Sequence, residues 1–156
     1  VSVAHYASFI GTKSPTKWDA QLTESNFQTR PRERRRTMIR RKEETEVKVM
    51  HEVQKGNGDV VFHTFMTKDE AYGAGRTFAR VEFLPGTSIG VHEHHGEFEG
   101  YYVLKGQALV TDNGTESILN PGDYHMCKDG DSHGIACYGE EPMEIIALII
   151  SVPGQS

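Results

Sequence analysis

The sequence predicts an all-β fold in which about nine or ten short strands form a sandwich or a barrel. Short runs of alternating, β-branched or aromatic residues recur from residue 44 onward, and turn sequences with Gly, Pro, Asn or Asp separate them. The sequence offers no segment with the 3.6-residue period of an amphipathic helix. The 156 residues, 37% of them hydrophobic, suffice for one domain with its own core.

The first predicted strand is residues 46–53, EVKVMHEV. Successive side chains of a strand point to opposite faces, so Val47 and Val49 share one side while Lys48 and Met50 share the other. The turn sequence KGNGD follows. We therefore expect a hairpin-like return of the chain and a second strand directly afterwards.

Further strands are predicted where a β-branched run ends at a turn. Residues 60–66 (VVFHTFM) form one, and residues 77–84 (TFARVEFL) form another that stops at Pro-Gly. The dipeptide Asn113-Gly114 joins QALVT to ESIL and is the strongest short hairpin signal. Residues 142–152 (PMEIIALIISV) close the domain as a strand expected in the core or at an interface.

Histidines and glutamates crowd into GVHEHHGEFEG, residues 90–100. On a strand, His92 and His94 point the same way and Glu93 points the opposite way. Glu99 begins the next strand and shares its face with Tyr101. Two imidazoles and a carboxylate can form a metal site with open coordination positions, whereas the alternative interpretation is a polar turn with exposed side chains.

The spacing of these residues resembles the first sequence motif of the cupins. Gly86, His92, His94, Glu99 and Gly106 occupy every position of that motif. The motif is specific because it fixes the identity of five residues over 21 positions.

A second cupin motif is similar but less complete. Gly122, Gly130 and His133 fit it, whereas Lys128 stands where the family usually has proline and Cys137 stands where asparagine is frequent. These departures leave the histidine in place. The resemblance covers residues from about 44 to 152.

This resemblance implies a double-stranded β-helix, the jelly-roll barrel of the cupins, with residues 38–156 as a single domain. It also implies that one divalent metal ion binds inside the barrel, with Fe, Mn or Ni favoured and Zn also compatible. Four protein ligands leave two positions of a six-coordinate ion for water, oxygen or substrate. The implied ligands are His92, His94, Glu99 and His133.

Other polar residues near the motif receive separate expectations. Glu93 and His95 are expected to face solvent, and the direction of Glu97 is left open. Gly100 weakens a strand unless another group approaches it closely. Tyr101 is a candidate catalytic hydroxyl beside Glu99, and a plain core tyrosine is the equal alternative.

Several remaining candidates have no partner at a characteristic spacing. Arg80 could meet an anionic substrate, but the outer face of the strand is the favoured position. Cys137 could share the face that looks into the barrel, as a small buried residue. The histidines expected to be structural or exposed are His51, His63 and His125.

Residues 1–37 read as a basic arm in front of the domain. Residues 1–42 hold ten Lys and Arg against three Asp and Glu, and residues 30–36 are RPRERRR. A solvated arm is the favoured interpretation, and an arm along a partner subunit or a sheet edge is an alternative. A further hypothesis is that Met38 is the natural start, which would make the arm non-native.

The cupin resemblance implies several functions, of which we favour a metal-dependent, dioxygenase-like oxidoreductase. Its substrate would be a small oxygen-rich or anionic molecule chelated to the metal. The alternatives are a non-catalytic barrel that binds a small molecule or sugar, and a metal-dependent sugar isomerase or epimerase. A homodimer is expected, because single barrels expose sheet edges.

The composition also predicts where the protein works. No apolar run reaches membrane length, and no helix-turn-helix pattern accompanies the basic arm, so neither a membrane nor nucleic acid is an expected partner. Only two cysteines occur and no apolar leader precedes the domain. A cytoplasmic location with reduced thiols is therefore expected.

Overall fold

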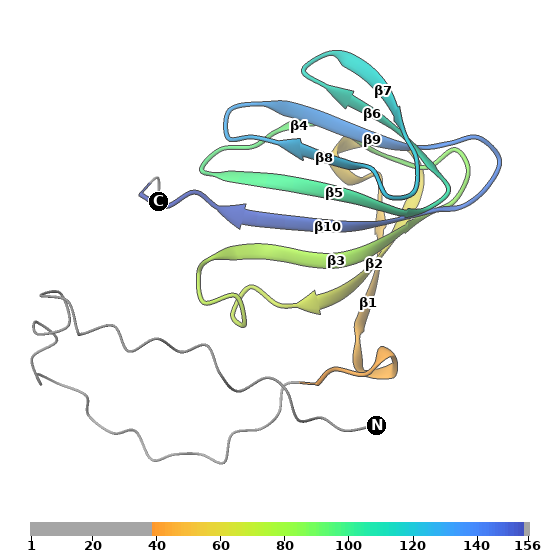
Figure 1. The fold of residues 1–156 in the computed structure, drawn as a ribbon. Helices are drawn as coiled ribbons and strands as arrows, with labels where there is room; N and C mark the ends of the chain where they lie inside the picture. The colour runs from red at the N-terminus through yellow and green to blue at the C-terminus, as the bar shows by residue number, and fades with distance from the viewer. Residues whose placement is uncertain (1–38, 155–156) are drawn as a thin grey trace, which may run out of the picture. The chain divides into compact units, whose positions relative to one another are not determined.

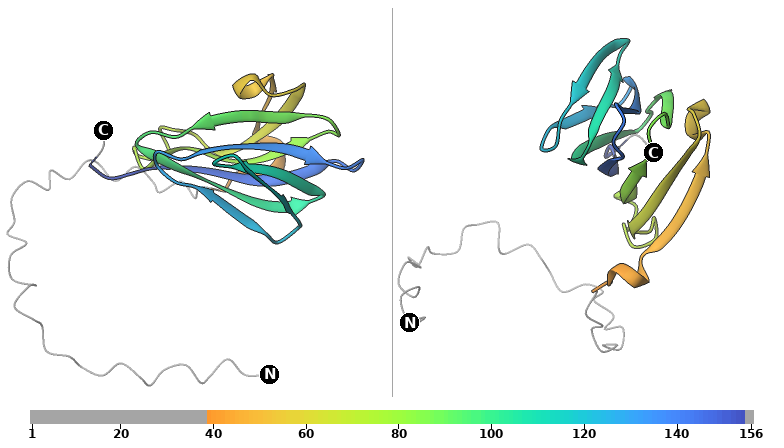
Figure 2. Two further views of the ribbon diagram at one scale, coloured as in Figure 1. Left: turned by 90° about the horizontal axis from the view of Figure 1, so that it is seen from above. Right: turned by 90° about the vertical axis from the view of Figure 1, so that its right-hand side faces the viewer.

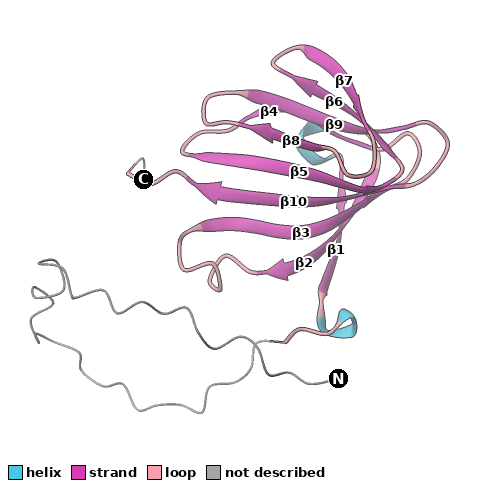
Figure 3. Cartoon of the chain, viewed as in Figure 1, coloured by secondary structure: helices cyan, strands magenta, loops and turns pink. Residues whose placement is uncertain are grey.

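A computed structural model describes residues 39–154 of the chain. This part is built from ten strands and two short 3-10 turns (Figures 1 and 3). The strands form two antiparallel sheets, so the predicted all-β fold is confirmed. The elements are η1 (Lys42–Glu44), β1 (Glu46–His51), η2 (Val53–Lys55), β2 (Asp59–Met66), β3 (Gly75–Phe83), β4 (Ser88–Glu93), β5 (Glu97–Lys105), β6 (Gln107–Asp112), β7 (Thr115–Leu119), β8 (Tyr124–Cys127), β9 (Ser132–Tyr138) and β10 (Met143–Ser151).

The larger sheet has six strands in the order β1-β2-β3-β10-β5-β8, which can be followed across Figure 1. The smaller sheet has four strands in the order β4-β9-β6-β7. Two further views in Figure 2 show strands β5 to β9 on one side of the domain and β1 to β3 on the other. The chain crosses repeatedly between the sheets, and this brings β4 and β5 from the first motif close to β9 from the second.

The predicted hairpin at Asn113-Gly114 joins β6 to β7. Both residues have positive φ, 47° for Asn113 and 82° for Gly114, as a tight hairpin turn requires. The turn therefore fixes the register of these two strands.

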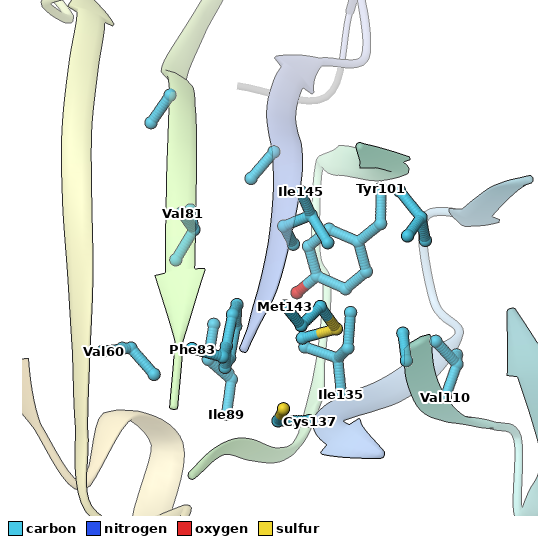
Figure 4. Close-up of a cluster of buried hydrophobic side chains, with 14 residues drawn as sticks. Val60, Val81, Phe83, Ile89, Tyr101, Val110, Ile135, Cys137, Met143 and Ile145 are labelled. Carbon is cyan, nitrogen blue, oxygen red and sulfur yellow. The ribbon is translucent and has the colours of Figure 1, made fainter. Parts of the chain in front are cut away.

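The core lies between the two sheets (Figure 4). Every second residue of a strand points inward and contributes its side chain to the core, so β10 alternates buried and half-buried side chains along most of its length. Tyr101 projects from β5 into this cluster and is completely buried. The largest buried apolar side chains around it are Phe83, Ile135, Met143 and Ile145.

A β-bulge interrupts β3 where it pairs with β10. Ile149 pairs with Thr77, but the next residue, Ile150, pairs with Gly75, so Arg76 is the extra residue. A Cβ on Gly75 would lie 2.3 Å from the carbonyl oxygen of Ile149, so only glycine fits there. Such bulges redirect side chains, and this one allows Arg76 to line the cavity between the sheets.

Strand β1 alternates as predicted, but its apolar side faces outward. Val47 and Val49 are exposed, whereas Lys48 and Met50 line the cavity. β1 is an edge strand, and the exposure of Val47 and Val49 shows that no other part of residues 39–154 covers its outer face.

The predicted basic arm, residues 1–37, and the hypothesis that Met38 is the start lie outside the described residues. Between residues 39 and 154, no helix is long and apolar enough to cross a membrane. Cys127 and Cys137 are free thiols, both buried.

Candidate metal centre

Three strands bring the four predicted ligands together. His92 lies near the end of β4, and His94 follows directly after that strand. His133 is the cross-strand partner of His92 on β9. Glu99 reaches the same point from β5 of the other sheet.

Their ligating atoms meet in a compact group. All four lie within 4.8 Å of one another, and His94, Glu99 and His133 are buried. The Nε2 atoms of His94 and His133 are 3.0 Å apart, and Oε2 of Glu99 lies 3.2 Å from the first and 3.0 Å from the second. His92 Nε2 stands 3.6 Å from the same oxygen.

These separations fit a metal ion at their centre. Adjacent ligands of an octahedral ion bound at about 2.1 Å lie roughly 3.0 Å apart. Three of the observed separations are 3.0–3.2 Å. Three imidazoles and one carboxylate suit Mn, Fe, Ni or Zn.

The Nδ1 atoms of the three histidines each have a partner on the far side of the ring. His92 Nδ1 lies 2.9 Å from the carbonyl oxygen of Gly90, and His94 Nδ1 lies 2.9 Å from Glu97 Oε1. An acceptor at Nδ1 fixes the proton there and leaves the lone pair on Nε2. The cluster thus directs lone pairs at a common point, where a cation would satisfy them all.

His125 supplies the third of these partners. Its Nε2 lies 3.1 Å from His133 Nδ1. Burial lowers the pKa of His125, and the neighbouring His133 lowers it further. A neutral His125 can accept the Nδ1 proton of His133, which orients that ring in the same way.

Glu99 remains ionised in this setting. Burial raises the pKa of Glu99, but in the metal-free cluster its hydrogen-bond contacts with His133, His92 and His94 outweigh burial and hold the pKa well below its usual value. The hydroxyl of Tyr101 donates a further hydrogen bond of 2.9 Å to Glu99 Oε2. Burial, together with the charge of Glu99, raises the pKa of Tyr101 well above its usual value, so the hydroxyl keeps its proton.

A cavity of about 270 Å³ opens beside the cluster. His92, Glu99 and Tyr101 line it, together with the cations Lys48 and Arg76. Apolar side chains form much of the remaining wall, among them Met50, Val53, Phe62, Ile89 and Ile149. The cavity therefore combines an apolar wall with positive charge near the cluster.

Glu97, whose direction the sequence left open, turns toward the cluster. Its Oε1 accepts from His94 Nδ1, and both its oxygens accept from Arg76, at 2.8 Å from Nε and 2.6 Å from Nη2. A hydrogen bond from Arg76 is the largest influence on the pKa of Glu97, which is lowered. Sequence reasoning missed Arg76; the glycine before it, at the start of a strand, was the available signal for a bulge.

His125 was also missed, since it was expected to be structural or exposed. Its position behind His133 depends on the pairing of β8 with β5, and nothing in the local sequence marks it. His51 is exposed beside Asp59, and His63 lies near Glu82 on the outer face.

Other expectations hold. Glu93 and His95 are largely exposed, with side chains 52% and 74% accessible, and pair with each other at 3.3 Å. Arg80 lies on the outer face, between Glu82 and Glu144, each at 2.6 Å.

Two small residues fill their expected roles. Gly100 is approached closely: a Cβ there would lie 2.6 Å from the hydroxyl of Tyr124. Cys137 is buried in the core cluster.

Comparison with known proteins agrees with this geometry. The cupin domain family model matches residues 79–150. An oxalate-binding protein from Thermotoga maritima is 34% identical over 113 residues, which is 72% of this chain and 93% of the relative. This chain belongs to the cupin family. Both sheets of the cupin domain contribute to the cluster, as the double-stranded β-helix of the family requires.

Solved structures support the same fold. A crystal structure of a predicted oxalate decarboxylase from Thermotoga maritima superposes with a TM-score of 0.71 at 34% identity, over 74% of this cupin and all of that chain. An RmlC-like cupin from Shewanella frigidimarina gives a TM-score of 0.55 at 18% identity, over 72% of this chain and 88% of that one, which supports the fold alone.

Residues 1–42 match a family of unknown function (DUF6783).

Proposed function

We propose that this cupin binds one divalent first-row metal ion and, on that ion, a small dicarboxylate of the oxalate class. The metal ligands in this proposal are His92, His94, Glu99 and His133. The observation that carries it is the convergence of four acceptor atoms at the wall of an open cavity. The similarity to an oxalate-binding relative supports the ligand class.

Charge supports the choice of an anion. A dication with three neutral imidazoles and one carboxylate keeps a charge of about +1, which is strong in a partly buried site. Lys48 adds positive charge to the cavity wall, and Arg76, whose charge is paired with Glu97, adds N–H donors. When bound, the metal would act as a Lewis acid and a template for chelation.

The protein's own side chains would prepare this site. Glu97 and the Gly90 carbonyl hold two histidine rings by Nδ1, so Nε2 faces the metal position. Tyr101 holds the carboxylate of Glu99 by a hydrogen bond. The apolar wall around Phe62 and Ile89 limits water in the cavity.

The experiment measures metal content and oxalate binding together. Protein purified without chelator is expected to contain about one first-row metal ion per chain by elemental analysis, and His92→Ala is expected to lose most of it. His95→Ala, which changes the adjacent exposed histidine, serves as the control and keeps the metal. Calorimetric titration with oxalate should then show binding only to metal-loaded protein. Full metal content in His92→Ala, or no oxalate binding to loaded wild type, contradicts the proposal.

The dioxygenase-like oxidoreductase is the second candidate. It is favoured by the four-residue ligand set, which leaves two positions of a six-coordinate ion open beside the cavity. Glu99 and Tyr101 are the residues we would assign to its chemistry: Glu99 would act as a base if it left the metal or would stay as a ligand, and Tyr101 would be a hydrogen-bond donor. Oxygen uptake by iron-loaded protein with small acids, enols or diols tests it, and a screen without uptake counts against it.

The sugar isomerase alternative stays a prediction from the sequence. It would leave oxygen untouched and convert a sugar phosphate. A discontinuous assay of sugar phosphates with metal-loaded protein separates it from the oxygenase.

We further propose a cytoplasmic homodimer. Apolar side chains remain exposed on the outer side of the larger sheet, among them Val49, Tyr102, Leu104 and Tyr124. Such a surface favours association of two copies. Light scattering that shows a monomer at micromolar concentration would contradict the dimer.

A further inference from the structure

We infer that Arg76 is the residue that recognises the outer oxygens of the metal-bound dicarboxylate, and that it thereby makes the cavity prefer oxalate-like dianions over monocarboxylates. This inference rests on the proposed function, and it adds the residue that sets ligand selectivity. Four features of the structure support it.

First, the backbone is built to place this side chain. Regular alternation along β3 would send residue 76 to the same outer side as Arg80. The bulge between Gly75 and Thr77 breaks that alternation, and the bulge requires glycine at position 75 because Ile149 O lies 2.3 Å from the position of a Cβ. As a result, Arg76 lines the cavity with His92 and Glu99.

Second, the guanidinium is held in a fixed orientation. Its Nε and Nη2 donate to the two oxygens of Glu97, and Glu97 in turn binds His94 Nδ1. A guanidinium that is fixed by a carboxylate fork loses little further entropy when it binds an anion.

Third, Arg76 has donors to spare. A guanidinium has five N–H groups, and the two nitrogens bound to Glu97 use two of them. Nη1 has no hydrogen-bond partner among residues 39–154, and the side chain is 48% exposed. These donors are available to a ligand in the cavity.

Fourth, the chemistry of the ligand matches. Oxalate that chelates a metal uses one oxygen of each carboxylate and leaves two oxygens pointing outward. Acetate leaves no such pair. Planar guanidinium is the group best suited to paired carboxylate oxygens.

Lys48, the other cation of the cavity wall, is a weaker candidate. It lies on the edge strand β1 and is exposed, and no ion pair holds its ammonium group among the described residues. A flexible ammonium group offers a point charge without directional pairing.

The test compares four forms of metal-loaded protein by calorimetric titration with oxalate and, separately, with acetate. Arg76→Met is expected to lower oxalate affinity by roughly ten- to a hundredfold, the range for one charge-assisted anchor, and to lower acetate affinity much less. Arg76→Lys should recover part of the loss. Arg80→Met, the matched arginine of the same strand on the outer face, should bind oxalate like wild type.

A double variant separates direct contact from simple charge. Arg76→Met leaves Glu97 without its cation, and the uncovered negative charge alone would weaken anion binding. Arg76→Met/Glu97→Gln removes that charge, and we expect oxalate binding to remain weak. Restored oxalate affinity in the double variant would overturn the inference.

The outcomes also distinguish the inference from the proposed function. If loaded wild type does not bind oxalate, the proposed function fails, and the inference fails with it. If wild type binds oxalate and Arg76→Met binds it equally well, only the inference fails. Elemental analysis of each variant verifies one metal per chain, so a weakened ligand affinity cannot arise from an empty site.

Discussion

Replacing Tyr101 by phenylalanine removes one hydroxyl at the centre of the domain. That hydroxyl donates 2.9 Å to Glu99 Oε2, and the ring is completely buried. The ring stacks on His133 with 4.8 Å between centroids and an angle of 5° between planes. Phenylalanine keeps this stacking, so the variant isolates the hydrogen bond.

The size of the effect follows from what Glu99 loses. A hydrogen bond to a buried ionised group contributes about 1.5–3 kcal/mol. Glu99 retains its contacts with the histidines, so we expect a loss of about 2 kcal/mol in the unfolding free energy of metal-free protein. For a domain of this size the melting temperature should fall by about 5–10 °C. Because the hydroxyl also orients the carboxylate, metal affinity should fall by up to about tenfold.

Urea unfolding of the metal-free protein and metal titration of the same samples measure both effects. Tyr102→Phe is the matched control, since Tyr102 is the next residue on β5, points outward and is 43% exposed. If Tyr101→Phe is as stable as Tyr102→Phe and binds metal as tightly as wild type, the hydroxyl does not support Glu99, and Tyr101 is only a core residue.

The remaining predictions concern packing and pH. Gly75→Ala should lower the free energy of unfolding, measured with urea, by about 2–3 kcal/mol, because its Cβ meets a backbone carbonyl at 2.3 Å. Gly100→Ala should lower it by less than about 1 kcal/mol, because the half-exposed ring of Tyr124 can move aside. Equal losses in the two variants would contradict this reasoning. A hydrogen bond from Arg40 is the largest cause that lowers the pKa of Glu70 to about 2. Because the pKa of Glu70 is lower in the folded protein, its ionised carboxylate stabilises the fold above the usual value near pH 4.5, and this stabilisation is lost as the pH falls toward 2. Glu70→Gln should therefore destabilise the protein at pH 7 and progressively less below pH 4.5. A difference from wild type that is constant between pH 7 and pH 3 would refute that reasoning.

Much of the candidate site could be predicted because its signals are local. His92 and His94 lie two residues apart, and strand alternation alone sends them to one face and Glu93 to the other. Glu99 and Tyr101 share a face for the same reason. His133 could be assigned only by resemblance to the second cupin motif, because 34 residues separate it from Glu99.

The residues that were missed act through tertiary contacts. Arg76 faces the cavity because of a bulge, and a one-residue bulge reverses the alternation on which strand predictions depend. His125 reaches His133 because β8 pairs with β5 while β9 belongs to the other sheet. The outward direction of Val47 and Val49 also depends on the sheet, since alternation defines two faces without saying which one is buried.

The amino-acid sequence by itself determined the all-β class, the turns and the set of polar residues near the metal position. These features follow from side-chain alternation, turn chemistry and motif spacing, which act over a few residues. Only the tertiary structure decided which groups bind the Nδ1 atoms of the histidines, which cations line the cavity and which face of β1 is exposed. Strand pairing between distant segments sets these positions, and its register cannot be derived from any one segment alone.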